Sequence, residues 1–312
     1  MKRKSAHGGG APAALQEGLV VGSHGRHCVV ETPDGQRVIC HPRGKKTAAV
    51  VGDRVQWLAS EDEGTIERVQ ERRNLFYRQD EIRTKSFAAN LDLVLMLVAA
   101  EPVFSEMQLA RALVAAEDAG IAPLIALNKQ DLAAPFAQAW ERLAPYRAIG
   151  YEVLPLSLSG SRAAAAHAAL AERLREKTTL VLGPSGAGKS TLTNLVVPEA
   201  RAATGEISQA LQSGRHTTTT TSWYWVDRAS HTALIDSPGF QEFGLHHIAA
   251  AHLPDCMPDI RAHAQDCRFY NCTHLHEPGC GVIAAVQAGQ ISASRYRIYG
   301  ELYAELSRAP RY

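Results

Sequence analysis

The chain has 312 residues, enough for two or three domains with cores of their own, which excludes a peptide or a disulfide-stapled mini-protein. Its 33 basic and 32 acidic residues leave a net charge of +1, so bulk charge gives no argument for a nucleic-acid partner. The longest apolar run, residues 93–100, is far shorter than the ~20 residues that span a bilayer. Residues 1–16 also lack the apolar stretch of a signal peptide. We therefore expect a cytoplasmic protein without a membrane partner, beginning with a flexible tail over residues 1–14.

Residues 15–80 alternate short β-rich runs with dense turn signals and show no helical period. Turns such as Pro33-Asp34-Gly35 between such runs are typical of a small all-β barrel. Five short strands fit an OB-type barrel, although an SH3-like barrel that docks on its neighbour fits the pattern nearly as well. Residues 1–87 carry 15 basic and 11 acidic side chains, which is weak support for contact with RNA.

Apolar strands alternate with helix-period stretches from residue 91 to residue 182. Ser105 and Gln108 have the spacing of a capping box, which predicts that one helix begins here. Strict alternation predicts a parallel sheet with helices on both faces, and we assign residues 81–245 to this α/β domain. Doubly wound sheets bind ligands beyond the carboxyl ends of their strands, so the chemistry is expected in those loops.

Residues 183–190 match the phosphate-binding pattern G-x-x-x-x-G-K-S in full, between an apolar strand and the start of a helix. The glycines let backbone N–H groups surround the phosphates, Lys189 can reach the β- and γ-phosphates, and Ser190 can hold Mg²⁺. A glycine-rich turn with a chance lysine is the alternative, which the strand and helix context disfavours. The residues expected to contact the nucleotide are Gly183, Pro184, Ser185, Gly186, Ala187, Gly188, Lys189, Ser190 and Thr191.

A second motif, Asn128-Lys129-Gln130-Asp131, follows another apolar strand and selects the base. The Asp131 carboxylate can accept from both N1–H and the exocyclic amino group of guanine, a donor pair that adenine lacks. Asn128 would tie this loop to the phosphate loop, and the stem of Lys129 would lie along the base. After the next strand, Ser157 is placed to bring a backbone N–H near the guanine O6, although serine-rich loops are common. We therefore predict GTP rather than ATP.

The remaining nucleotide motifs lie downstream of the phosphate loop. Asp236 ends an apolar run and opens Asp-Ser-Pro-Gly, so that its carboxylate can reach Mg²⁺ through water and the N–H of Gly239 can contact the γ-phosphate. Residues 214–221 read Gly-Arg-His followed by five threonines, a polar segment that could supply a hydroxyl to Mg²⁺. The start of a threonine-rich strand is the alternative for its last two residues.

The order of these motifs is reversed relative to an ordinary small GTPase, because the guanine motif precedes the phosphate loop. We predict a circularly permuted GTPase domain whose second switch leads directly into the C-terminal domain. Phe240 stands where Ras-like enzymes carry a water-orienting glutamine, and an apolar side chain cannot orient water. His216 is the nearest candidate for that role, with a surface histidine as the alternative. We expect slow intrinsic hydrolysis that depends on a partner.

Four of the six cysteines crowd into residues 256–280. Three sulfurs and one nitrogen in a Cys-x4-Cys-x-His-x5-Cys pattern predict one structural Zn²⁺ per chain, with disulfides as the alternative. The predicted ligands are Cys267, Cys272, His274 and Cys280. The spacing does not exclude His276 or Cys256 as a substitute ligand. We assign residues 246–312 to a small, mostly helical zinc-binding domain, in which Ile298, Leu302 and Leu306 mark a helix that packs on the metal knot.

Together the barrel, the permuted order, GPSGAGKST, GRHTTTT, DSPGF and the cysteine pattern closely resemble the RsgA family of ribosome small subunit-dependent GTPases. The resemblance runs from about residue 17 to the last helix. It implies a bacterial cytoplasmic GTPase that joins late maturation of the small ribosomal subunit, is stimulated by it and helps to release assembly factors. It also implies an OB-fold that touches ribosomal RNA, His274 rather than His276 as the zinc ligand, Thr218 as the switch residue that senses Mg²⁺, and His216 at the family's proposed catalytic position.

Two other classes of function compete with this interpretation. A P-loop ATPase that remodels RNA would have no use for Asp131, so the choice of nucleotide separates it from a GTPase. A non-enzymatic zinc adaptor that binds RNA and barely hydrolyses nucleotide is favoured only by Phe240. Nothing in the sequence requires more than a monomer.

Overall fold

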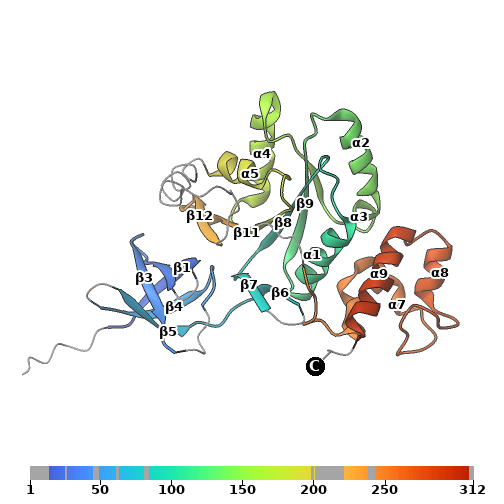
Figure 1. The fold of residues 1–312 in the computed structure, drawn as a ribbon, viewed down its shortest axis with the longest axis horizontal. Coiled ribbons are helices and arrows are strands. Elements are labelled where there is room, and N and C mark those ends of the chain that lie inside the picture. Colours follow the sequence, from blue (N-terminus) through green and yellow to red (C-terminus); the bar gives the residue numbers. More distant parts are fainter. Residues whose placement is uncertain are drawn as a thin grey trace, which may run out of the picture. The chain divides into compact units, whose positions relative to one another are not determined.

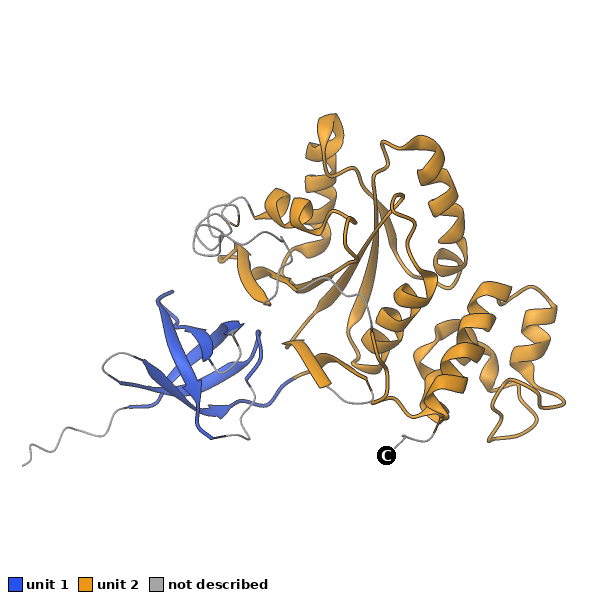
Figure 2. Ribbon diagram, in the orientation of Figure 1, with its two compact units in different colours: residues 1–72 blue, residues 73–312 orange. Residues whose placement is uncertain are grey.

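The computed structural model describes residues 14–24, 27–44, 49–60, 63–80, 84–197, 200, 221–237 and 243–308. The chain divides into two compact units, residues 1–72 and residues 73–312 (Figure 2). No helix in the described part of the chain is both long and apolar enough to cross a membrane.

The first unit is a five-stranded barrel. Its strands are β1 (Gln16–His24), β2 (His27–Glu31), β3 (Arg37–Pro42), β4 (Arg54–Ala59) and β5 (Gly64–Val69). Strand β1 pairs with both β2 and β4, and β3 pairs with β5 in parallel, so the hydrogen-bonded ring runs β1-β2-β3-β5-β4-β1. This closed ring with one parallel pair is the OB arrangement, and it decides between the two barrels that the sequence left open.

The barrel closes around alternating apolar residues and ends on a buried ion pair. Val20, Val30 and Ile66 are fully buried in its core. The carboxylate of Asp53, also fully buried, accepts from Nε of Arg72 at 2.7 Å and from Nη2 at 2.8 Å. A bidentate pair of this kind compensates the desolvation of the carboxylate. Arg72, the last residue of the unit, is thereby anchored to the barrel.

The second unit is built on a six-stranded sheet. Its strands are β8 (Leu93–Ala99), β9 (Ala122–Asn128), β10 (Val153–Pro155), β11 (Thr178–Leu182), β12 (Ser222–Asp227) and β13 (Thr232–Asp236). They run in the order β10-β9-β8-β11-β13-β12, and all neighbours are parallel except β12 and β13. The chain moves outward from β8 through β9 to β10 and then crosses back to β11. The carboxyl ends of β8 and β11 therefore form a topological switch point, where such sheets bind ligands.

Helices cover both faces of this sheet (Figure 1). They are α1 (Glu106–Asp118), α2 (Ala133–Arg142), α3 (Ala144–Ala148), the short 3₁₀ turn η1 (Gly160–Arg162), α4 (Ala163–Leu174) and α5 (Lys189–Val196). Leu170 of α4 and Leu192 of α5 pack with Leu95 of β8 in one buried cluster, and α1 lies on the opposite face. The Ser105 hydroxyl accepts from the backbone N–H of Gln108 at 3.3 Å, as the capping signal predicts.

A hairpin precedes the sheet and meets the segment that leaves it. Strands β6 (Leu75–Gln79) and β7 (Thr84–Ala89) pair with each other in the second unit, although the sequence analysis placed residues 73–80 in the barrel domain. The N–H of Gln79 donates to the carbonyl of Gly244 at 3.0 Å, and the N–H of His246 donates to the carbonyl of Gln79 at 3.0 Å. A Cβ at residue 244 would lie 2.4 Å from that carbonyl oxygen, so this clasp between residues 75–79 and 243–246 requires glycine.

The C-terminal part of the second unit is helical. It contains the 3₁₀ segment η2 (Ala250–Cys256), α7 (Pro258–Ala264), α8 (Gly281–Gln287) and α9 (Ala293–Leu306). Ile298 and Leu302 of the predicted helix are fully buried, whereas Leu306 is half-buried. Arg111 of α1 holds α9 against the sheet domain, because its guanidinium pairs with Glu305 and also donates to the carbonyl of Phe243 at 3.2 Å.

Candidate functional site

The predicted phosphate loop lies between β11 and α5, at the switch point of the sheet. Gly186 and Gly188 have φ angles of 80° and 101°, in the left-handed region that side chains rarely adopt. A Cβ on Gly183 would stand 2.7 Å from the carbonyl oxygen of Leu97 at the end of β8. Helix α5 then begins at Lys189, with Ser190 in its first turn. The loop therefore presents backbone N–H groups and a helix N-terminus, the combination that binds phosphates.

The lysine of this loop is paired with the aspartate that ends the neighbouring strand. Lys189 Nζ lies 2.5 Å from Oδ1 of Asp236, and both side chains are 10% exposed. Strands β11 and β13 are adjacent and parallel, which brings the two residues to the same edge of the sheet. The hydroxyl of Ser237 donates to the carbonyl of Val181 at 2.9 Å and fixes the backbone next to Asp236.

The guanine motif is joined to the phosphate loop by one side chain. Nδ2 of Asn128 donates to the carbonyl of Ala187 at 2.9 Å, and its Oδ1 accepts from the N–H of Leu158 at 3.2 Å. Asn128 thus ties its own loop to the phosphate loop, as the sequence predicts, and also contacts the loop after β10. Lys129 follows with a φ of 68°, and the N–H of Gln130 donates to the carbonyl of Leu156 at 2.9 Å. These bonds hold the motif at the carboxyl edge of the sheet.

Asp131 is exposed and is oriented by a residue of the next loop. The Ser157 hydroxyl donates to its Oδ1 at 2.8 Å, and this hydrogen bond is the main cause that lowers the pKa of the Asp131 carboxyl. From the sequence, only a backbone contact between Ser157 and guanine is predicted. Its side chain has a further part, because a carboxylate that stays ionised and keeps one orientation is a better acceptor for two neighbouring N–H donors.

Most of the predicted switch residues lie outside the described part of the chain. They include His216, Thr218, Gly239 and Phe240. Thr221, which follows the first of these segments, and Ser237, which precedes the second, are both buried.

The sequence and the fold of this chain are similar to those of known proteins. The profile of the RsgA GTPase family matches residues 69–246, which span the hairpin, the sheet and both nucleotide motifs. This chain belongs to the RsgA GTPase family. It is a GTPase with a circularly permuted domain, as the reversed order of its motifs predicts.

Individual relatives support the same assignment. The chain is 70% identical over 312 residues to the small ribosomal subunit biogenesis GTPase RsgA of Variovorax paradoxus, with 98% of each chain covered. It is 52% identical to the protein of the same name from Paraburkholderia xenovorans, over 96% of this chain and 97% of that one. Among solved structures, YjeQ from Thermotoga maritima matches with a TM-score of 0.73 at 28% identity, covering 95% of this chain and all of that one. The circularly permuted GTPase YloQ matches with a TM-score of 0.70 at 29% identity, covering 96% of this chain and 98% of that one.

The predicted zinc ligands of this RsgA family member come together in space. The ligand atoms of Cys267, Cys272, His274 and Cys280 all lie within 4.8 Å of one another, whereas Cys256 and His276 are outside the group. Nδ1 of His274 lies 3.3 Å from Sγ of Cys267 and 3.6 Å from Sγ of Cys280, and the two sulfurs are 3.7 Å apart. Zinc bonds of about 2.3 Å to sulfur and about 2.0 Å to nitrogen give tetrahedral edges of about 3.5–3.8 Å, so the donor set fits a zinc ion.

The loop that carries these ligands is organised by a residue that the sequence analysis missed. The carboxylate of Glu277 accepts from the hydroxyl and the N–H of Thr273, at 2.6 and 2.8 Å, and from the N–H groups of Leu275 and His276 at 3.2 Å. Burial opposes its ionisation, but these hydrogen bonds lower the pKa of Glu277 overall. The Tyr296 hydroxyl adds a hydrogen bond to the carbonyl of His274 at 2.8 Å. Glutamate next to a proline gives no pattern from which this role could be predicted.

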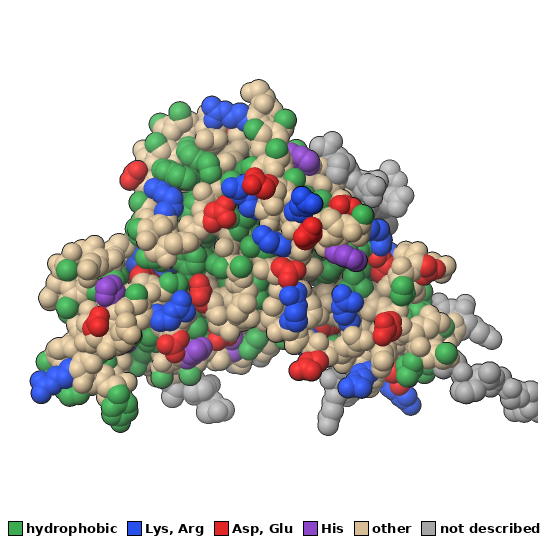
Figure 3. Space-filling model, turned by 180° about the vertical axis from the view of Figure 1, so that it is seen from behind, with side chains coloured by type: hydrophobic (Ala, Val, Ile, Leu, Met, Phe, Trp, Pro, Cys, Tyr) green, Lys and Arg blue, Asp and Glu red, His purple; other side chains and the backbone are tan. Residues whose placement is uncertain are grey.

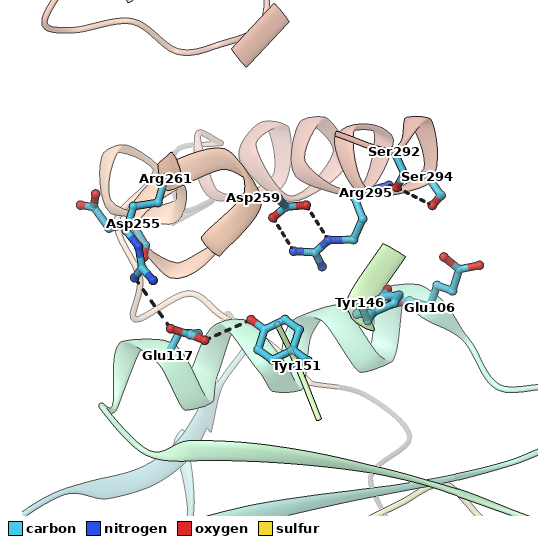
Figure 4. Close-up of polar contacts among 10 residues, drawn as sticks. All are labelled: Glu106, Glu117, Tyr146, Tyr151, Asp255, Asp259, Arg261, Ser292, Ser294 and Arg295. Carbon is cyan, nitrogen blue, oxygen red and sulfur yellow. Dashed lines mark hydrogen bonds and ion pairs between the residues drawn. The ribbon is translucent and has the colours of Figure 1, made fainter. Parts of the chain in front are cut away.

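A buried ion pair stands where the C-terminal helices meet the sheet domain (Figure 4). Asp259 of α7 accepts from Nε of Arg295 at 2.9 Å and from Nη2 at 2.8 Å, and each side chain is 2% exposed. The guanidinium lies 5.0 Å from the ring centre of Tyr146 in α3. Nη1 has no hydrogen-bond partner among the described residues. Arg295 thus joins α9, α7 and the sheet domain through a charge pair and a cation–π contact.

Proposed function

We propose that this GTPase acts in late maturation of the small ribosomal subunit, and that GTP hydrolysis switches its contact with the subunit and its release of assembly factors. The observation that carries the proposal is the identity of 70%, over nearly the whole length, to a protein named as a small ribosomal subunit biogenesis GTPase. The Asn128 bond to Ala187 supports it, because it joins the base-selecting loop to the phosphate loop as a GTPase requires. We assign the protein to the cytoplasm as a monomer.

Within this proposal, the residues of the nucleotide site have separate roles. Asp131 reads guanine, with Asn128, Lys129, Gln130 and Ser157 supporting it, and residues 183–191 bind the phosphates. Ser190, Thr218 and Asp236 would hold Mg²⁺, which would neutralise charge on the β- and γ-phosphates; hydroxyl and carboxylate oxygens are the donors that this ion prefers. Lys189 and Asp236 are paired with each other in this structure. Binding of the nucleotide would have to separate them, because Lys189 is needed at the phosphates and Asp236 at Mg²⁺.

The catalytic step is assigned to His216 and the γ-phosphate contact to Gly239. Phe240 cannot orient a water molecule, so the chain depends on a histidine that the subunit brings into position. His216→Ala should reduce GTP turnover in the presence of small subunits by ~100-fold or more. His167, exposed on α4, provides the matched control. Equal loss in both variants would contradict the assignment.

The barrel is proposed to contact ribosomal RNA, and the Cys267, Cys272, His274 and Cys280 cluster to hold one structural Zn²⁺. Over the face of the molecule in Figure 3, Lys and Arg side chains are interspersed with Asp and Glu. A groove of about 610 Å³ in the barrel is lined by Glu17, Asp34 and Glu63 among others, which disfavours a phosphate backbone there. On this face and in this groove, a contact with RNA would therefore rest on individually placed basic residues rather than on a broad basic patch.

The deciding experiment measures hydrolysis of GTP and of ATP by the purified protein, alone and with added small ribosomal subunits. We expect a slow rate with GTP alone, no use of ATP, and a sharp rise with GTP when subunits are present. GTP turnover indifferent to subunits would remove the ribosomal role and keep the GTPase. Equal turnover of ATP would overturn the assignment of Asp131.

A further inference from the structure

A second group of metal-ligating side chains lies where α1 meets η2, and it shares no residue with the Cys267–Cys280 cluster. Asp118 is the last residue of α1, and His252 and Cys256 belong to η2. One carboxylate oxygen, one imidazole nitrogen and one sulfur of these three residues all lie within 4.8 Å of one another. The fold thus places together, from segments far apart in sequence, three side chains of the types that bind transition metals.

The spacing of these atoms suits a shared ion better than a direct contact. Oδ1 of Asp118 is 3.4 Å from Nε2 of His252. Charge-assisted hydrogen bonds between nitrogen and a carboxylate are shorter, about 2.7–2.9 Å. Zinc bonds of about 2.0–2.1 Å to oxygen and nitrogen give a tetrahedral edge of about 3.3–3.4 Å. The two donors therefore stand at the separation that a common ion would set.

The histidine is already oriented for coordination. Its Nδ1 lies 3.1 Å from Oδ2 of Asp255, while Nε2 is directed toward Asp118. A carboxylate that holds one ring nitrogen of a histidine fixes the tautomer and leaves the other nitrogen to bind the metal. Asp255 is therefore the orienting partner in the arrangement that metal-binding histidines usually have.

The surroundings carry more negative than positive charge. The carboxylates of Asp118, Asp255 and Glu117 all act on the buried thiol of Cys256, and they are opposed by Arg261. Arg261 is the one cation among them, and its Nη1 donates to the carbonyl of Asp255 at 2.9 Å and lies 3.8 Å from Glu117 (Figure 4). A divalent cation placed between these groups would offset the repulsion among the carboxylates.

A buried imidazole stands beside the group. The side chain of His247 is 5% exposed, and its Nε2 lies 3.9 Å from Oδ2 of Asp118. Its Nδ1 has no hydrogen-bond partner within the described ranges. His247 therefore lies next to Asp118, while Asp118 and His252 are exposed and give an ion a path in.

We propose that Asp118, His252 and Cys256 bind one divalent transition-metal ion, with Zn²⁺ as the best match to the oxygen, nitrogen and sulfur donors and with water in the fourth position. Three protein ligands hold an ion less tightly than four, so this ion exchanges more readily than the one assigned to the cysteine cluster. It would brace α1 of the GTPase core against η2, just beyond the clasp at residues 243–246. Its loading would then change how firmly the C-terminal helices are held.

The test counts metal ions on the full chain. We would load the protein with Zn²⁺, remove free metal, measure bound zinc, and then titrate Co²⁺ into protein that retains only the tightly held ion. Wild-type protein should bind a second equivalent with a thiolate-to-cobalt absorption band, and Zn²⁺ should raise its Tm. His252→Ala should lose that equivalent and the rise in Tm, and Asp118→Asn should weaken it by ~10- to 100-fold.

Matched variants separate this site from the cysteine cluster and from misfolding. His252 is half exposed, so its replacement leaves the fold intact, which guanine-nucleotide affinity would verify. His167→Ala and Cys28→Ala remove a histidine and a buried cysteine elsewhere and should keep the second equivalent. Cys272→Ala should lose only the tightly held ion. Wild-type protein without the second equivalent, or a second equivalent that survives in His252→Ala, would overturn the proposal.

Discussion

The side-chain amide nitrogen of Asn128 lies 2.5 Å from the point where a Cβ atom on Gly188 would stand. Gly188 also has a φ of 101°, so two independent constraints require glycine there. Because the same Asn128 nitrogen donates to the carbonyl of Ala187, the phosphate loop and the guanine loop share one contact point. Any side chain at residue 188 has to push the two loops apart.

Gly188→Ala should therefore lose affinity for guanine nucleotides by more than ~10-fold, beyond the ~1–2 kcal/mol of stability that a left-handed alanine costs. Binding of a fluorescent GDP analogue and thermal unfolding measure the two effects separately. Gly120→Ala is the matched control, because Gly120 has a φ of 63° but nothing within 4 Å of its added Cβ. The control should lose stability and keep its affinity, and equal affinity in both variants would refute the shared contact.

Asp131→Asn should shift base preference from guanine toward xanthine, because an amide can donate to the extra carbonyl of xanthine. The loss of a bidentate contact predicts ~10- to 100-fold weaker binding of GDP, measured by competition with XDP. Asp227→Asn is the control, since Asp227 is also exposed and also accepts from a serine hydroxyl, that of Ser230 at 2.6 Å. A change of preference in the Asp227 variant would show that the effect is not one of base recognition.

Ser157→Ala should make guanine binding sensitive to acid. The hydrogen bond from Ser157 lowers the pKa of the Asp131 carboxyl, so removing it moves that pKa upward toward its ordinary value. Affinity for GDP, which requires the ionised form, should then begin to fall at a higher pH than in the wild type. A titration of affinity between about pH 3.5 and 7 checks this, and superimposable profiles would contradict it.

Breaking the Asp259 and Arg295 pair should destabilise the second unit strongly. Asp259→Leu or Arg295→Met alone leaves one charge buried, at a cost of about 3–5 kcal/mol, whereas the double variant should recover most of that loss. Urea unfolding of the wild type, the two single variants and the double variant gives a double-mutant cycle. Arg297→Met, which breaks an exposed pair with Glu301, should change the free energy of unfolding by less than about 1 kcal/mol. Additive losses in the double variant would argue against direct pairing.

The Glu305 contact predicts how the C-terminal helices respond to acid. The guanidinium of Arg111 lowers the pKa of Glu305, so the stabilisation is present above the ordinary glutamate pKa and is lost as pH falls through the lower, folded value. Glu305→Gln should therefore flatten the loss of stability below about pH 4.5. Unfolding free energies measured across that range check it, and an unchanged acid slope would mean that other carboxylates carry the effect.

Local motifs were predictable because each is short and lies at a fixed place on a strand or helix. The phosphate loop, the Asn128–Asp131 motif and the four predicted zinc ligands are continuous or nearly continuous in sequence, and the structure places each of them as expected relative to the sheet or in one cluster. The parallel sheet followed from the alternation of apolar strands and helices. Side-chain detail was less accessible, since the sequence does not show that the hydroxyl of Ser157 faces Asp131.

Contacts between distant segments could not be predicted in the same way. Nothing in the sequence pairs Arg295 with Asp259 or brings Asp118 to His252, because each pair is set by how whole helices pack. The hairpin of β6 and β7 was divided by the domain boundary predicted at residue 80, because short, β-rich strands look alike in either domain. Its place became visible only through the pairing of Gln79 with the segment after the sheet.

The clasp at Gln79 makes the permuted domain a closed loop of chain. Gln79 and Leu245 form a parallel bridge, so the strand that enters the domain and the segment that leaves it run side by side in the same direction. Pulling these two ends of the domain apart would first have to break both hydrogen bonds of Gln79. A load applied between the two ends would therefore act on the clasp, which is separate from the edge of the sheet that carries the phosphate loop.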